Sequence, residues 1–217
     1  MSDTVRSMPV QPGEKAPDFS LPAVHQAGSV SLSDYRGKTP VLVAIFRGLY
    51  CPFCRRALAR FDAMSGKLRQ AGAESLAIVA TDTENARFYF KLRPARVAVG
   101  ADPGCVTHQA FGVPAPPIDA PETQAAFSTR INPTGELPEA LPVAEAGSAM
   151  NRLDSYQETG SDLRDRQEHG TQLKGQFLLD RDGIVRWMNI EGMREGPAGL
   201  GKFPSEAELL EAVKALG

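Results

Sequence analysis

The junction that determines the topology reads Phe46-Arg47-Gly48-Leu49-Tyr50-Cys51-Pro52-Phe53-Cys54-Arg55-Arg56. It follows the apolar run 41–45, which is typical of a strand, and precedes a helical pattern over 57–64. Two cysteines separated by two residues therefore lie where a strand turns into a helix. Because a helix N-terminus can make a thiol reactive, this arrangement indicates redox chemistry.

The composition fits a soluble globular domain with a sizeable core. The chain has 217 residues, of which 42% are hydrophobic and 23% charged. A formal net charge of −2 offers no field for a phosphate backbone, so no nucleic-acid partner is expected. No apolar run approaches the roughly 18 residues of a membrane span, and the N-terminus lacks the apolar segment of a secretory signal. With only three cysteines, a cytoplasmic setting is the simpler expectation.

Strand and helix patterns alternate through the first half of the chain. Strands are predicted over 41–46, 74–80 and 97–99, and helices over 52–71, 83–92 and 105–111. Two late strands, 176–180 and 184–188, flank Arg181-Asp182-Gly183 and are predicted to form a hairpin. A last helix is expected over 205–216. The order predicts an α/β fold with a mixed central sheet flanked by helices.

Residues 114–173 do not fit this alternation. Seven prolines between Pro114 and Pro142 argue against regular structure there, and 140–167 is polar enough for a solvent-exposed helix or two. We therefore predict one domain, 1–217, with a long insertion over 114–173 before the C-terminal hairpin. The insertion is interpreted either as a decoration or as a lid, a substrate wall or a subunit contact.

Cys51 falls at the N-cap position of the predicted helix, with Pro52 at the first helical residue. A sulfur at the cap can accept hydrogen bonds from the free N–H groups of the first turn, and the helix dipole favours its anion. Arg47, Arg55 and Arg56 are close in sequence and are expected to add positive potential. All three effects predict a lowered pKa for Cys51.

Cys54 lies one turn further on and faces the same side, so it is the expected resolving thiol. Two other readings remain. The pair could consist of inert core cysteines, or it could bind zinc together with Cys105 and His108. The wide spacing between the two halves of that set disfavours zinc.

Cys105 alone is interpreted as a small buried side chain. The glycine-rich segment 196–202 is interpreted as a flexible connector, because it lacks the spacing of a phosphate-binding loop.

Several motifs together resemble one family. They are 13–19 (Gly-Glu-Lys-Ala-Pro-Asp-Phe), 30–38, Phe46-Arg47-Gly48-x-x-Cys51-Pro52-Phe53-Cys54, and 177–183 (Phe-Leu-Leu-Asp-Arg-Asp-Gly). The chain is similar to the peroxiredoxin-like branch (alkyl hydroperoxide reductase C / thiol-specific antioxidant) of the thioredoxin-fold superfamily. The resemblance covers about residues 10–113 and 174–217 and implies a thioredoxin-like fold.

By this resemblance Cys51 is the peroxidatic cysteine, which attacks the O–O bond of a hydroperoxide. The chain departs from the family's Pro-x-x-x-Thr-x-x-Cys pattern, because Ala44 and Gly48 replace the proline and the threonine. The family's later arginine falls on Lys174, which keeps the charge and loses the bidentate fork. Arg47 could then supply the donor that stabilises the leaving oxygen.

Cys-Pro-Phe-Cys also resembles the active site of glutaredoxins and related dithiol oxidoreductases. Those proteins carry a cis-proline directly before the late hairpin, whereas 173–176 contains none. The sequence therefore favours a thiol-dependent peroxidase with catalytic residues Cys51, Cys54, Arg47 and Lys174. The alternatives are a thiol–disulfide oxidoreductase and a non-catalytic redox sensor.

The resemblance also defines the expected partners. They are a hydroperoxide substrate and an external thiol reductant, either a thioredoxin-like protein or glutathione. No metal or organic cofactor is needed for this chemistry, and no membrane partner is expected. Whether the chain forms a homodimer is left open.

Overall fold

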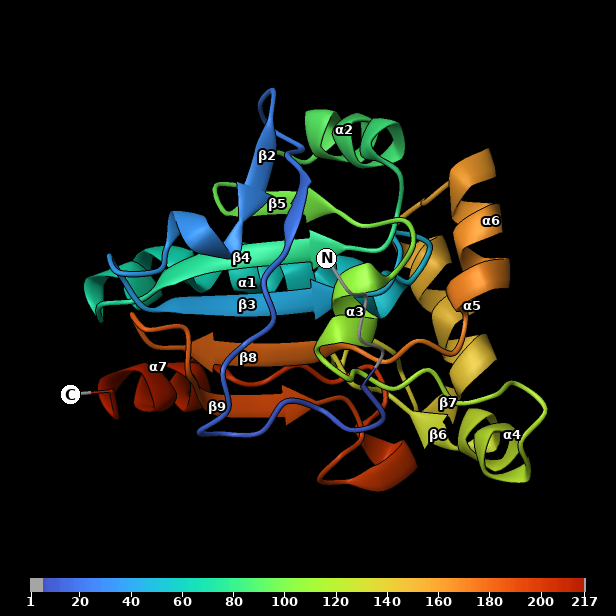
Figure 1. The fold of residues 1–217 in the computed structure, drawn as a ribbon. Helices are drawn as coiled ribbons and strands as arrows, with labels where there is room; N and C mark the ends of the chain where they lie inside the picture. The colour runs from blue at the N-terminus through green and yellow to red at the C-terminus, as the bar shows by residue number, and fades with distance from the viewer. Residues whose placement is uncertain (1–5, 217) are drawn as a thin grey trace.

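The computed structural model describes residues 6–216. Its centre is a five-stranded sheet in the order β5-β4-β3-β8-β9 (Figure 1). The strands are β3 (Val41–Phe46), β4 (Glu74–Val79), β5 (Ala98–Ala101), β8 (Gly175–Leu179) and β9 (Val185–Ile190). β3, β4 and β5 are parallel, while β8 is antiparallel to both β3 and β9. The predicted mixed sheet and late hairpin are therefore confirmed.

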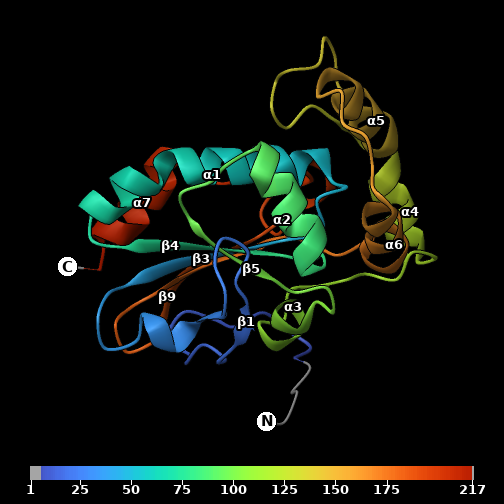
Figure 2. The same ribbon diagram turned by 90° about the horizontal axis from the view of Figure 1, so that it is seen from above.

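Helices and a small ribbon cover the two faces of this sheet (Figure 2). One face carries α1 (Pro52–Gln70), α2 (Thr83–Leu92) and α7 (Glu206–Lys214). The other face carries the ribbon of β1 (Ser20–Pro22) and β2 (Ser29–Ser31), together with α3 (Val106–Ala110). Two 3-10 turns, η1 (Leu32–Asp34) and η2 (Gly196–Gly199), complete these layers. Among residues 6–216, we find no helix with both the length and the apolar character needed to cross a bilayer.

The residues of β3 show why the sheet is covered on both sides. All six are buried, as the uninterrupted apolar run predicts. Leu42 and Phe46 pack with α1 and α7, whereas Val43 and Ile45 pack with the ribbon side of the molecule. Successive strand residues point to opposite faces, so one strand contributes to both halves of the core. This burial fixes the end of β3, and with it the start of the loop that carries Cys51.

The 114–173 segment lies beyond the carboxyl ends of β3, β4 and β5 (Figure 1). It contains α4 (Pro121–Ser128), β6 (Arg130–Ile131), β7 (Leu141–Pro142), α5 (Val143–Leu153) and α6 (Gly160–His169). Helices in the polar half agree with the sequence prediction. The prediction of no regular structure in the proline-rich half is wrong, because α4 begins with Pro121. Proline is well tolerated in the first turn, where its missing N–H would have no partner.

Candidate active site

Cys51 is the N-cap residue of α1, as the sequence predicts. Its backbone is extended (φ −81°, ψ 110°), and its sulfur accepts a hydrogen bond from the backbone N–H of Cys54 at 3.3 Å. Pro52 follows as the first helical residue. The sulfur therefore takes the place of the side-chain oxygen that usually caps a helix, and it satisfies one of the free N–H groups. Only 5% of Cys51 is exposed, so water contributes little to this environment.

Three charged side chains meet beside this cap. The guanidinium of Arg47 pairs with the carboxylate of Glu191, and Lys174 Nζ lies 3.1 Å from Glu191 Oε1. Lys174 Nζ also donates to the carbonyl oxygen of Lys202 (3.1 Å). Both Lys174 and Glu191 are buried. The two cations exceed the one carboxylate, so the cluster keeps a surplus positive charge that a thiolate can balance.

The strand register explains how residues so distant in sequence come together. Ile45 of β3 pairs with Gly175 of β8, which in turn pairs with Ile190 of β9. Arg47, Lys174 and Glu191 lie just beyond this row, at the same end of three neighbouring strands. The backbone also links two of these residues, because the N–H of Glu191 donates a hydrogen bond to the carbonyl oxygen of Lys174 (3.0 Å). The predicted positions of Arg47 and Lys174 beside Cys51 follow from this pairing.

This environment separates the acidities of the two cysteines. Burial disfavours the anion of Cys51, but the hydrogen bond with Cys54 and the charges of Arg47 and Lys174 outweigh it, lowering its pKa to about 6. For Cys54, burial and the neighbouring Cys51 anion raise the pKa well above its usual value. At neutral pH the pair thus consists of a thiolate at the cap and a thiol one turn inside the helix.

Glu191 is the main site residue that the sequence reasoning missed. Its carboxylate accepts hydrogen bonds from Arg47, from the amide and the ammonium of Lys174, and from the N–H of Gly201 (2.7 Å). Burial opposes its ionisation, but the two cations hold the pKa of Glu191 below its usual value. The available signal was an acidic residue directly after the second strand of the late hairpin, at the end where Cys51 lies. The segment interpreted as a connector therefore contributes Gly201 to the site.

Arg55 and Arg56 do not act as the sequence predicts. Arg55 donates to the carbonyl oxygens of Leu49 and Tyr50, and it pairs with Asp154 at 2.8 Å. Arg56 pairs with Glu136 and Asp154, at 2.8 and 2.7 Å. Their charges are compensated by carboxylates of the 114–173 segment. These arginines therefore anchor that segment to α1 and to the loop before Cys51, and they leave the activation of Cys51 to Arg47 and Lys174.

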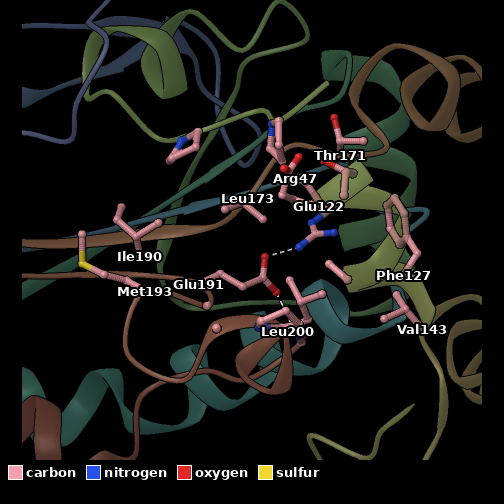
Figure 3. A pocket seen from close by; sticks show the side chains of 18 of the residues that line it. Arg47, Glu122, Phe127, Val143, Thr171, Leu173, Ile190, Glu191, Met193 and Leu200 are labelled. Atoms are coloured by element: carbon pink, nitrogen blue, oxygen red, sulfur yellow. Dashed lines mark hydrogen bonds and ion pairs between the residues drawn. The ribbon is translucent and has the colours of Figure 1, made fainter. Parts of the chain in front are cut away.

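A cavity of about 410 Å³ opens next to the charge cluster. Arg47 and Glu191 lie among its lining residues, and Figure 3 shows them paired between apolar side chains. Its apolar walls come from α1, from the 114–173 segment and from the region after β8; they include Phe53, Phe127, Ile131, Val143, Ile190 and Leu200. Cys51 is not one of the described residues that line the cavity, but Phe53 follows it by two positions.

Comparison with known proteins identifies the family. A model described as the AhpC/TSA family matches residues 12–188. The chain belongs to the AhpC/TSA family. No curated protein matches the sequence closely enough to count as a relative. Membership of this family places the chain among redox proteins of the thioredoxin fold.

Solved structures agree with this assignment at the level of the fold. Peroxidoxin BcpB from Mycobacterium tuberculosis is 13% identical with a TM-score of 0.60, covering 96% of this chain and 99% of that one. The reduced 2-Cys peroxiredoxin from Plasmodium vivax is 16% identical with a TM-score of 0.59, covering 96% and 82%. The mitochondrial 2-Cys peroxiredoxin from Plasmodium falciparum is 13% identical with a TM-score of 0.57, covering 95% and 94%. At these identities the likeness shows the shared fold.

The structure explains the two departures from the AhpC/TSA cysteine motif. A Cβ on Gly48, where the family has threonine, would lie 2.7 Å from the ring of Tyr50 and 3.0 Å from the carbonyl oxygen of Ala80. Ala44 pairs with strands on both sides of β3, where a proline would remove a ladder donor. This chain therefore has no room for the threonine side chain, and its charge cluster is the alternative source of stabilisation for the Cys51 anion.

Cys105 and His108, the other half of the zinc alternative, lie at α3. Cys105 is buried, and burial together with the carboxylate of Asp102 raises its pKa. Burial and the charges of His169 and Arg47 lower the pKa of His108 to about 3, so its ring is neutral at pH 7. Across residues 6–216, no cluster of three or more His, Cys, Asp or Glu side chains is arranged to hold a metal ion. Cys51, Cys54, Cys105 and His108, the ligands of the disfavoured zinc alternative, are thus not gathered into one metal site within 6–216.

Proposed function

We propose that this protein is a thiol-dependent peroxidase in which Cys51 reduces hydroperoxides and Cys54 resolves the oxidised cysteine. One observation carries the proposal: the sulfur of Cys51 caps α1 beside two cations that share a single carboxylate. The lowered pKa of Cys51, about 6, supports it, because the thiolate and not the thiol is the nucleophile.

The reaction begins with the Cys51 thiolate attacking one oxygen of the hydroperoxide. An S–O bond forms and the O–O bond breaks, so the sulfur is oxidised to a sulfenic acid and the peroxide is reduced to an alcohol or water. The leaving oxygen gains negative charge as the bond breaks and takes up a proton. Arg47 is the group suited to stabilise that charge, since it reaches both the cavity and the surroundings of the sulfur.

Cys54 completes the oxidative half. Its thiol condenses with the sulfenic acid of Cys51, an S–S bond forms and water leaves. A dithiol, or two molecules of a monothiol, then returns two electrons and regenerates both cysteines. We assign this step to an external thiol reductant, a thioredoxin-like protein or glutathione. The short distance in sequence between the two cysteines means that the chain can form this disulfide without a second subunit.

The test follows oxidation of the reduced protein by stopped flow. Hydrogen peroxide is mixed with wild type and with Cys51→Ser, Cys54→Ser and Cys105→Ser, while Trp187 fluorescence and free thiols are recorded. Wild type and Cys105→Ser should lose two thiols rapidly, and Cys51→Ser should not react. Cys54→Ser should stop at a sulfenic acid that dimedone traps. Equal rates in wild type and Cys51→Ser would reject the proposal.

A second function is favoured by the placement of Cys54 in the first turn of α1. A dithiol at positions 51 and 54 can also exchange with an external disulfide, which would make the protein a thiol–disulfide oxidoreductase. Oxidised glutathione in the same experiment separates the two. Turnover with the disulfide and none with peroxide would favour this function, and slow stoichiometric oxidation without turnover would indicate a redox sensor. The cytoplasmic setting and the single-domain organisation stay predictions.

A further inference from the structure

The cavity beside Arg47 is larger than a packing defect. Protein interiors contain few voids bigger than a water molecule, whereas sites for small ligands measure roughly 300–1,000 Å³. A volume of about 410 Å³ falls in the second range. Its walls are mostly apolar and include a few polar side chains, namely the ion pair of Arg47 and Glu191 together with Glu122, Thr123 and Thr171, which is the usual composition of a ligand site (Figure 3). The cavity therefore has the size and the lining of a site for a small ligand.

The charges at the cavity restrict what that molecule can be. Arg47 is already paired with Glu191, and Glu191 is held further by Lys174 and Gly201. An anion would have to displace this buried carboxylate from its donors and would also meet Glu122 among the lining residues. A cation would face the surplus positive charge of the cluster. An uncharged apolar group meets neither penalty, so that is the class of ligand that fits.

The walls on one side come from the 114–173 segment. α4 contributes Ala126 and Phe127, β6 contributes Ile131, and α5 begins with Val143. This side is held in place by α1 and by the region after β9. Asp154 at the end of α5 pairs with Arg55 and Arg56, and a Cβ on Gly201 would lie 2.6 Å from Pro133 Cγ. The wall therefore has a fixed position relative to α1 and to the loop before Cys51.

We propose that Phe127, Ile131 and Val143 form a specificity wall that receives the uncharged apolar group of the substrate. The inference rests on the proposed peroxidase function and deepens it. A substrate whose organic group fills the cavity brings its peroxide end toward Arg47, which lines the cavity and whose charge also acts on the sulfur of Cys51. Hydrogen peroxide gains nothing from this wall. Cys51 therefore prefers large apolar hydroperoxides because of a segment that contributes no reacting atom.

The test compares kcat/KM for cumene hydroperoxide and for hydrogen peroxide. Wild type should prefer cumene hydroperoxide by at least tenfold. Ala126→Phe, which fills the cavity, should lower that preference at least tenfold, mainly through KM. Phe127→Ala removes apolar contact without adding bulk, so it should lower the preference as well and serves if Ala126→Phe does not fold. Leu153→Ala is the matched control, because Leu153 is exposed on α5 and does not line the cavity.

A binding measurement separates this inference from the proposed function. Ligand-observed NMR with 2-phenylpropan-2-ol, an inert alcohol, is carried out on Cys51→Ser and on Cys51→Ser combined with Ala126→Phe. Binding to the first and its loss in the second supports the wall, even if neither hydroperoxide oxidises the wild type and the proposed function fails. A substrate preference that Ala126→Phe and Phe127→Ala leave unchanged overturns the inference while the peroxidase proposal stands. Absence of binding to Cys51→Ser overturns it as well.

Discussion

Cys51 and Cys105 occupy the same nominal position and have opposite acidities. Each is the N-cap residue of a helix, α1 or α3, and each is almost fully buried, with 5% and 2% exposed. Yet the pKa of Cys51 falls to about 6, while burial and nearby carboxylates raise the pKa of Cys105. Position at a helix N-terminus is thus insufficient to activate a thiol.

The difference lies in cap geometry and in the sign of the surrounding charge. Cys51 has an extended backbone and its sulfur accepts the N–H of Cys54. Cys105 is left-handed (φ 52°) and its sulfur accepts nothing, because the carboxylate of Asp102 takes the N–H groups of Val106 and Thr107 (3.1 and 2.8 Å). At the start of α1, cations lie beside the sulfur of Cys51. At the start of α3, the carboxylate of Asp102 accepts the N–H groups that a capping sulfur would accept.

The largest effect that would break this contrast is loss of the reactive sulfur itself. Cys51→Ser should reduce peroxide turnover by roughly 1,000-fold or more, because no other thiol in the pair is ionised at neutral pH. Cys105→Ser should stay within about twofold of wild type, since the raised pKa of Cys105 keeps it protonated. Initial rates of peroxide consumption at pH 7 measure both. A comparable loss of peroxide turnover in the two variants would show that the different acidities of Cys51 and Cys105 do not determine which thiol reacts.

Removing the cation at the active cap should have the next largest effect. Arg47→Met should raise the pKa of Cys51 by at least about one unit and slow its alkylation near pH 6 by at least about fivefold, because the thiolate loses a charge partner. Iodoacetamide rates across pH 4–9 give the midpoint. In the control, Arg56→Met, the midpoint should stay near 6, since Arg56 is neutralised by Glu136 and Asp154. A shift in Arg56→Met alone would reverse the assignment.

The acidic surroundings of Cys105 make a pH-dependent prediction about stability. Burial, with the charges of Asp162 and Asp82, raises the pKa of Asp165 from 3.8 to about 6. The folded state then binds this proton more tightly than the unfolded state, so the contribution is fully present below about pH 4 and is lost as the pH rises through 6. Asp165→Asn should increase the free energy of unfolding at pH 8 by about 2 kcal/mol. Denaturant midpoints at pH 5 and 8 check this, with a smaller gain expected at pH 5.

The smallest expected effect sharpens the comparison at α3. Asp102→Asn keeps an oxygen that can cap the helix but removes the negative charge beside Cys105, so the pKa of Cys105 should fall toward its usual value. Stability should fall by about 1 kcal/mol, because asparagine keeps only one of the two oxygens that accept the N–H groups of Val106 and Thr107. The alkylation rate of Cys105 at pH 9, measured in a Cys51→Ser, Cys54→Ser background, reports the shift, because the rate follows the thiolate fraction. An unchanged rate would assign the raised pKa of Cys105 to burial and to the charges of Asp165 and Glu168.

Local patterns predicted the elements that local interactions determine. The buried strand 41–46, the helix that begins at Pro52 and the turn at Gly183 (φ 79°) were readable because each depends on neighbouring residues. The cap at Cys51 belongs to the same class. These features were enough to predict the order of strands and helices and the position of the candidate nucleophile.

Contacts between residues far apart in the sequence could not be predicted from local patterns. Arg47 and Glu191 are separated by 144 positions, and only the pairing of β3, β8 and β9 brings them together. Arg55 and Arg56 looked equivalent to Arg47 because a sequence does not show on which side of a helix an acidic partner lies. α4 was missed because prolines were counted without regard to their place in a turn.

The row of Arg47, Lys174 and Glu191 is set by three strands that hydrogen-bond to one another, and none of its members belongs to 114–173. The charge cluster beside Cys51 is therefore assembled without any side chain of the 114–173 segment. Its length and sequence could drift, or be exchanged for another, while the register of β8 on β3 continues to assemble the same electrostatic unit. The side chains that act on Cys51 and the proposed specificity wall therefore belong to separate parts of the chain, so under our proposal a change of substrate would not require a change at the thiolate.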